Sequence, residues 1–169
     1  MGQHVSFDAF YRAVFARLVG QLFLVTADQQ EAQDLVQEAM ARAVARWSKL
    51  CRYEAPELWV RRVALNLAVS RARRHRRWLA VLPRLTPPPP APPASPEALA
   101  LLSAMRELPI RQRQALVLHY FLDLPVDQIA VELSVPANSV KTWLRRGRLA
   151  LAELLDDHAE PFREEIVDA

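Results

Sequence analysis

The chain has 169 residues, of which 51% are hydrophobic and 24% are charged, and it carries a net charge of +3. This length and apolar content suffice for one domain or two small ones, and the presence of only three glycines and few β-branched runs favours helices. A single cysteine, Cys51, excludes a disulfide within a monomer and fits a reducing compartment. Neither a signal segment nor an apolar run of about 20 residues is apparent, so we expect a cytoplasmic protein without membrane insertion.

The charge is distributed unevenly along the chain. Residues 1–78 hold 13 Lys and Arg against 7 Asp and Glu, whereas residues 156–169 hold one arginine against six acids. A cationic first half indicates an anionic partner, which the acidic tail would repel. Most of the basic residues are arginines, whose guanidinium groups bind phosphate and base edges in a bidentate manner.

Three helices are predicted in residues 1–78, because apolar side chains recur there at helical spacing. Ser6 and Asp28 are suitable N-caps for the first two helices. Pro56 is a favourable first residue for the third. We expect these helices at residues 7–25, at about 29–47 and from 56 to 78, with a polar, irregular segment at 48–55.

A proline-rich linker is predicted at residues 79–95. Eight prolines lie between positions 83 and 96, and such a run favours a stiff polyproline II spacer over helix or sheet. A second helical domain at residues 96–155 then begins with Ser95 as N-cap. Its expected helices start at residue 96 and cover 108–121, 125–133 and 136–155. The fold class is therefore all-α, with two small helical domains, a linker, and an acidic tail at 156–169.

The last two of these helices have the spacing of a helix-turn-helix. Ala130 allows a close helix crossing, Ser134 stands in the turn where glycine is commonest, and Val140 packs into the crossing. The outward face of the second helix could be an ordinary solvated face. Its first turns, however, carry small polar residues, and the face carries no acid, which favours DNA binding. The candidate DNA-binding residues are Asn138, Ser139, Lys141, Thr142, Arg145, Arg146 and Arg148.

A second basic cluster lies near the end of the first domain. Arg71, Arg73, Arg74, Arg76 and Arg77 place five charges in seven residues. Complementing the helix dipole needs only one or two cations, so this density indicates a polyanionic partner.

Several aromatic residues lie close to this basic cluster in the sequence. We expect Trp47 and Trp59 in the core, because they lie on apolar stripes. Tyr53, in the irregular segment, is the better candidate for stacking on a base. A third cluster, Asp34, Gln37 and Glu38, has by its chemistry alone the character of a solvated helix face.

These clusters occur in one order in the segments DLVQE, WVRRVALNLA and LPIRQR…VKTWLRRGR. In this the chain resembles the extracytoplasmic-function (ECF) sigma factors of the sigma-70 family. The resemblance implies a region 2-like domain at 1–78 and a region 4-like domain at 96–155. It also implies a factor that binds core RNA polymerase, through the β′ clamp and the β flap, and directs promoter-specific initiation on double-stranded and melted DNA.

The resemblance also implies roles for individual residues. It places core-polymerase contacts at Asp34, Leu35, Gln37 and Glu38. It places contacts to the downstream (−10) promoter element at Tyr53, Arg62, Asn66, Arg71, Arg73, Arg74 and Arg77. It assigns the helix-turn-helix to the upstream (−35) element, although Trp143 takes a place where family members often carry a smaller or basic residue. An anti-sigma factor is a further partner that family members commonly have.

A stand-alone DNA-binding regulator and an enzyme are alternatives to this function. A stand-alone helix-turn-helix regulator would use the same recognition helix without polymerase. An enzyme is disfavoured, because the four histidines are scattered and no metal-ligand spacing or phosphate-binding glycine loop occurs. We therefore expect a non-enzymatic protein without a cofactor or metal.

Overall fold

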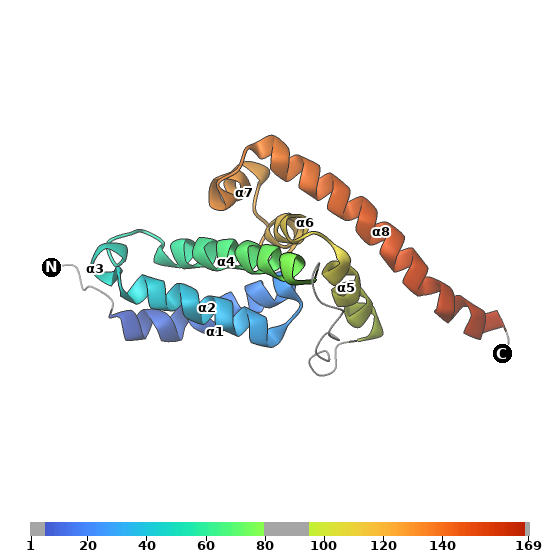
Figure 1. Ribbon diagram of the computed structural model, residues 1–169, viewed down its shortest axis with the longest axis horizontal. Helices are drawn as coiled ribbons and strands as arrows, with labels where there is room; N and C mark the ends of the chain where they lie inside the picture. Colours follow the sequence, from blue (N-terminus) through green and yellow to red (C-terminus); the bar gives the residue numbers. More distant parts are fainter. Residues whose placement is uncertain (1–5, 80–94, 168–169) are drawn as a thin grey trace. The chain divides into compact units, whose positions relative to one another are not determined.

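A computed structural model of the chain describes residues 6–79 and 95–167, all of whose regular elements are helices (Figure 1). It divides into two compact units, unit 1 (residues 1–91) and unit 2 (residues 92–169). The all-α prediction is confirmed for the described residues. The predicted linker lies, apart from its ends, outside them.

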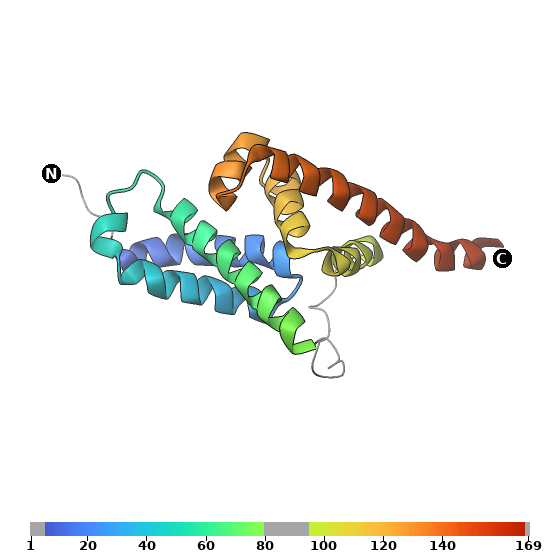
Figure 2. The same cartoon turned by 45° about the horizontal axis from the view of Figure 1, so that its top comes forward.

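Unit 1 contains three long helices and one short one. In Figures 1 and 2, α1, α2 and α4 lie side by side, and α3 lies near the end of α2. The second helix was predicted to continue to residue 47, but Ala45 and Arg46 interrupt it and a separate turn of helix follows. Part of the segment predicted to be irregular, 48–55, is thus helical. The bounds are α1 Phe7–Thr26, α2 Gln29–Val44, α3 Trp47–Leu50 and α4 Pro56–Leu79.

Local side-chain hydrogen bonds begin α1 and α2, as predicted. The Ala9 amide donates to Ser6 Oγ over 3.2 Å, and the Glu31 amide donates to Asp28 Oδ1 over 2.8 Å. Each bond satisfies one of the backbone donors that a helix start leaves unpaired. Between the helices, Ala27 adopts a left-handed conformation with φ of 54°, which reverses the chain within two residues.

The core of unit 1 is built around α2, which packs against both α1 and α4. Among the described helices, α1 is also long and apolar enough to cross a membrane. The core helices of many soluble proteins share this length and composition, and the buried residues of α1 form a stripe that includes Leu18, Leu22 and Val25. The hydrophobic residues of α1 thus contribute to the core of unit 1.

Unit 2 begins with the predicted N-cap. The Ala98 amide donates to Ser95 Oγ over 3.3 Å, and Pro96 is the first helical residue. Hydrogen bonding to Ser95, and secondarily to its own backbone, lowers the pKa of the exposed Glu97 carboxyl. The bounds in this unit are α5 Pro96–Glu107, α6 Ile110–Leu116, η1 Val117–Phe121, α7 Val126–Leu133 and α8 Ala137–Val167.

The helix predicted at 108–121 differs from expectation at both ends. Leu108 is extended, so α6 begins after Pro109, and the helix widens into the π-helical turn η1. His119 Nδ1 lies 2.9 Å from the Leu124 carbonyl oxygen, which can only accept, so this nitrogen donates. This bond ties η1 to the segment that leads into α7.

The predicted helix-turn-helix is formed by α7 and α8. Ser134 has φ of 54°, the left-handed conformation that explains why glycine suits this place, and the Val135 amide donates to the Ala130 carbonyl over 3.0 Å. Ile129 and Val140 are fully buried at the crossing. The last helix was predicted to end at residue 155 but continues to Val167.

We expect Gly147→Ala to destabilise unit 2. A Cβ atom at Gly147 would lie 2.9 Å from Leu116 Cδ1, in a buried contact between α6 and α8. Overpacking of this kind costs about 1–3 kcal/mol and should exceed the gain of about 1 kcal/mol in helix propensity. The free energy of unfolding in urea is the measurement.

Gly20→Ala is the matched control, because Gly20 lies at an exposed position of α1 and nothing lies within 4 Å of its added Cβ. It should stabilise unit 1 by about 0.5–1 kcal/mol through helix propensity alone. Equal stabilisation by both substitutions would show that Gly147 does not limit the approach of α6 to α8.

Candidate nucleic-acid interface

The predicted DNA-reading face of α8 is exposed along its first three turns. Ser139 is half-buried, whereas the other six candidate residues are exposed. The Thr142 hydroxyl donates to the Asn138 carbonyl over 2.9 Å, which fixes one side chain in the second turn. The opposite face is buried through Val140 and Leu144, so packing determines which face of the helix is free to enter a groove.

Two side-chain contacts flank this face, and neither was predicted. On one side, the Arg111 guanidinium lies 5.7 Å from the ring centroid of Trp143. On the other, Arg148 Nη1 donates to the Tyr120 hydroxyl over 3.3 Å. Trp143 is half-buried and lies against Arg111 of α6, so the packing of unit 2 accommodates its large ring.

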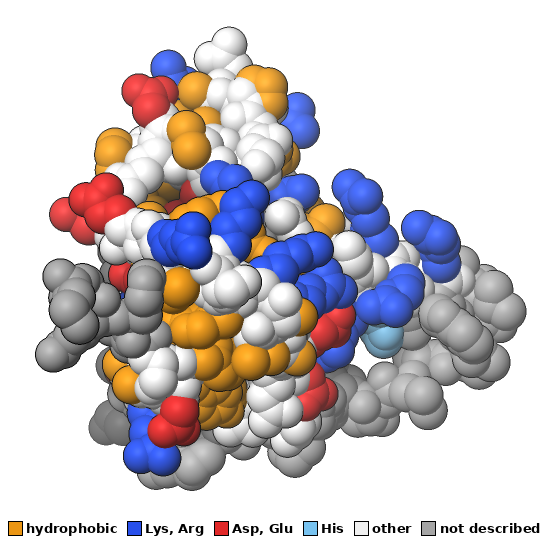
Figure 3. Space-filling model, turned by 90° about the vertical axis from the view of Figure 1, so that its left-hand side faces the viewer, with side chains coloured by type: hydrophobic (Ala, Val, Ile, Leu, Met, Phe, Trp, Pro, Cys, Tyr) orange, Lys and Arg blue, Asp and Glu red, His pale blue; other side chains and the backbone are white. Residues whose placement is uncertain are grey.

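In unit 1, a cleft of about 570 Å³ brings together residues from two of the predicted clusters. It lies between α2 and α4, with neutral polar groups from Asn66 and Ser70 and an apolar part from Val63 and Leu67. Basic side chains gather on one side of the face shown in Figure 3, with a few acidic ones among them. The charged residues that line the cleft are Glu38, Arg42, Arg73, Arg74 and Arg77.

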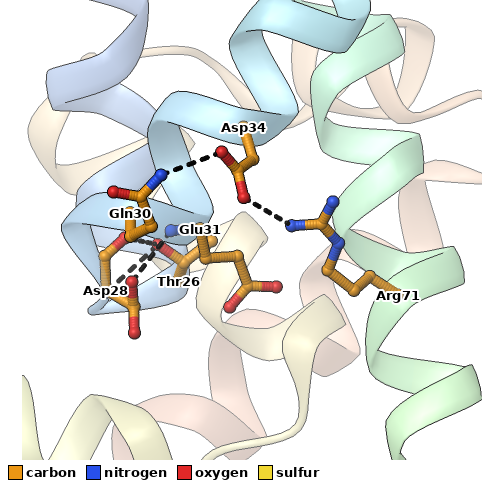
Figure 4. Close-up of polar contacts among 6 residues, drawn as sticks. All are labelled: Thr26, Asp28, Gln30, Glu31, Asp34 and Arg71. Carbon is orange, nitrogen blue, oxygen red and sulfur yellow. Dashed lines mark hydrogen bonds and ion pairs between the residues drawn. The ribbon is translucent and has the colours of Figure 1, made fainter. Parts of the chain in front are cut away.

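The acidic cluster of α2 contacts arginines directly. Asp34 Oδ2 lies 3.8 Å from Arg71 Nη1, and its other oxygen accepts a 3.0 Å hydrogen bond from Gln30 Nε2 (Figure 4). One turn further along, Glu38 Oε1 accepts a 2.6 Å bond from Arg42 Nη2. Both carboxylates are more than 40% exposed, so they remain accessible to a partner.

Among the predicted polymerase contacts, Leu35 needs correction. Its side chain is 0% exposed, so it packs in the core of unit 1 and presents no surface to a partner. The residue lies on the same helix as the acids but on its inward side, which the motif alone does not reveal. Asp34, Gln37 and Glu38 are each at least partly exposed and remain predicted contacts.

The predicted −10 contacts are not all in the cleft. Tyr53 is 44% exposed in the segment between α3 and α4, and neither it nor Arg62 lines the cleft. Trp47 is half-buried against Phe10, with ring centroids 4.8 Å apart. Trp59 is likewise half-buried rather than in the deep core, with the Arg46 guanidinium 5.8 Å from its ring centroid.

Within the residues that the structure describes, no group of three or more His, Cys, Asp or Glu side chains could hold a metal ion. What the described geometry offers is guanidinium groups, amides and hydroxyls on two helical surfaces. This chemistry suits the binding of phosphate and base edges.

Known families match both units. Residues 9–78 match the family model for sigma-70 region 2, and residues 98–151 match that for sigma-70 region 4. The chain is 31% identical to the RNA polymerase sigma-E factor of Streptomyces antibioticus over 76% of this chain and 73% of the relative. It is 29% identical to the ECF RNA polymerase sigma factor SigM of Mycobacterium tuberculosis, over 91% of this chain and 79% of the relative.

A solved structure shares the fold. The sigma factor RpoE of Bartonella quintana, crystallised with the anti-sigma factor NepR, aligns with a TM-score of 0.70 and 21% identity over 89% of this chain and 96% of that one. The family models together cover most of the chain, and in each unit they span the surface described above. The chain therefore belongs to the sigma-70 family and is an ECF sigma factor, a protein that directs promoter-specific initiation of transcription by RNA polymerase.

Proposed function

We propose that the two units divide promoter recognition between them, unit 1 at the polymerase and the −10 element and unit 2 at the −35 element. The observation that carries this proposal is the pair of cationic surfaces, one per unit, each within a matched sigma-70 region. Two readers on one chain act bivalently, because binding of the first holds the second at high effective concentration.

In unit 2, α8 enters the major groove of the −35 element. Asn138, Lys141 and Thr142 lie in the first turns, the part of a recognition helix that reaches base edges. Arg145 and Arg146 follow one turn later and bind guanine edges or phosphates. The Tyr120 hydroxyl holds Arg148 at the side of the helix, where phosphates of the groove wall pass.

In unit 1, the exposed face of α2 docks on the β′ clamp through Asp34, Gln37 and Glu38. Exposed carboxylates suit a basic partner surface, and complementary charges across an interface fix its register and speed association. The β flap is the corresponding partner of unit 2. We extend the proposal to an anti-sigma protein, the kind of partner that RpoE has in its solved complex.

The cleft between α2 and α4, with the neighbouring segment that carries Tyr53, binds the −10 element as its strands separate. Asn66 and the α4 arginines supply hydrogen bonds and charge, and Tyr53 provides an exposed ring on which an extruded base can stack. Extracting a base costs a few kcal/mol, and capture of that base offsets the cost. This division of labour needs no catalytic group, so we propose a non-enzymatic, cytoplasmic factor.

The first prediction concerns polymerase dependence. Core RNA polymerase mixed with the chain should start transcripts at new, defined positions, and the chain alone should bind the same promoters much more weakly. Mapping of transcript ends and gel shifts with and without core enzyme measure both. Equally tight promoter binding without polymerase would favour the stand-alone regulator, and failure to associate with core enzyme would refute the proposal.

The second prediction concerns the acidic face. Asp34→Asn should weaken association with core polymerase by about tenfold, the effect of removing one charged hydrogen bond. Asp8→Asn removes the same charge from an exposed ion pair on α1, with Arg12, and should leave association unchanged. Fluorescence titration of labelled chain with core enzyme is the measurement. Equal losses in both variants would mean that only net charge matters.

The third prediction concerns α8. Arg145→Ala should weaken binding to the −35 element by about 1–3 kcal/mol and relax base preference at one position, if the guanidinium reads a base. Gel shifts of the polymerase complex on promoters substituted base by base give both quantities. A uniform loss across all sequences would reassign Arg145 to a phosphate.

A further inference from the structure

The cleft in unit 1 is lined by one arginine that does not come from α4 and that has no proposed role in DNA binding. Arg42 lies on α2, the helix proposed to face polymerase, yet it lines the same cleft as Arg73, Arg74 and Arg77 of α4. Its side chain is 51% exposed, so it is accessible from solvent. Within the described residues, Arg42 pairs with the carboxylate of Glu38, at 2.6 Å.

The lining of the cleft suits the backbone of a single DNA strand. Four guanidinium groups face one carboxylate there, so the cleft is cationic. The lining of α4 runs from Val63 to Arg77, which at 1.5 Å per residue extends over about 21 Å and can follow several consecutive phosphates. The apolar part formed by Val63 and Leu67 gives room for sugars or an unstacked base between the charges.

We propose that Arg42 is a DNA-binding residue, which adds a phosphate contact from α2 to the strand that the α4 arginines hold. The inference rests on the proposed function of unit 1, and it adds to that function a contact from α2 and a course for the strand. An acidic peptide is the competing occupant. Its carboxylates would bind the guanidinium groups, but it has no sugars or bases to contact the apolar part of the cleft.

The ion pair with Glu38 limits how strongly Arg42 can contribute to DNA binding. In the chain alone, this carboxylate occupies the guanidinium that a phosphate would bind, so the two anions compete. Neutralising Glu38 removes the competitor and one negative charge from the cleft. Glu38→Gln should therefore strengthen binding of a single strand, and Arg42→Gln should weaken it.

The chain offers a matched control for each change. Arg12 and Asp8 on α1 form an ion pair of the same spacing, i and i+4, at 3.1 Å and outside the cleft. Arg12→Gln and Asp8→Asn thus alter net charge as Arg42→Gln and Glu38→Gln do. Asp8, Arg12 and Arg42 are exposed and Glu38 is half-buried, and circular dichroism would verify the helical content of all four variants.

The experiment titrates full-length chain against a fluorescein-labelled oligothymidylate of about ten nucleotides at several salt concentrations. Each single-strand phosphate contact contributes about 0.7 to the slope of log K against log salt. Arg42→Gln should reduce this slope by about 0.7 and weaken binding about two- to fivefold at low salt, whereas Arg12→Gln should leave the slope unchanged. Glu38→Gln should tighten binding more than Asp8→Asn.

Three outcomes would overturn the inference. They are equal slopes for Arg42→Gln and Arg12→Gln, no detectable binding of the oligothymidylate by the unaltered chain at low salt, and tighter binding of a polyglutamate peptide than of the oligonucleotide. If the unaltered chain still directs initiation, only the role of Arg42 is lost. If the slopes differ as expected but core polymerase is not bound, the cleft stands and the proposed function fails.

Discussion

The buried stripe of α2 is the constraint on which unit 1 depends. Ala32, Leu35 and Ala39 are fully buried between α1 and α4, so the rotation of α2 about its own axis is fixed by packing. That rotation determines where the polar side of the same helix points. Buried alanines and a leucine therefore fix the direction of Asp34 and Glu38, although these apolar side chains are themselves inaccessible from the surface.

The same geometry explains how a small domain carries so many arginines. Five positive charges in seven residues repel one another, and helix-dipole complementation offsets only a small part of that repulsion. Two carboxylates of α2 lie near guanidinium groups, Asp34 beside Arg71 and Glu38 beside Arg42. Exposed ion pairs contribute only about 0.2–1 kcal/mol each to the free energy of unfolding, so these two pairs affect the orientation of the side chains more than the stability of the fold.

The features that follow from short-range chemistry could be predicted from sequence. The N-caps Ser6, Asp28 and Ser95 and the turn at Ser134 each depend on a few neighbouring residues, and all four were found where expected. Boundaries were less accurate, since neither the break after Val44 nor the π-helical turn η1 is marked by a change in the apolar spacing of the sequence.

The candidate site was predictable in composition but not in arrangement. The basic residues of α4 and α8 were recognisable as cationic faces, and the family resemblance supplied roles for the acids of α2. Contacts between residues far apart in sequence, such as Arg111 with Trp143 and Arg148 with Tyr120, leave no periodic signal. The cleft that joins Arg42 to the α4 arginines likewise exists only once α2 and α4 pack.

The separation of the two faces of α8 has a consequence for altering this protein. Val140, Leu144 and Gly147 hold the helix in place, while Asn138 and Arg145 point away from that contact. Outward residues can therefore be exchanged for those of a relative with little effect on folding. On the proposed role of α8, such transplants would change which promoters the chain selects. Sets of factors with different promoter preferences could then be built on this one scaffold.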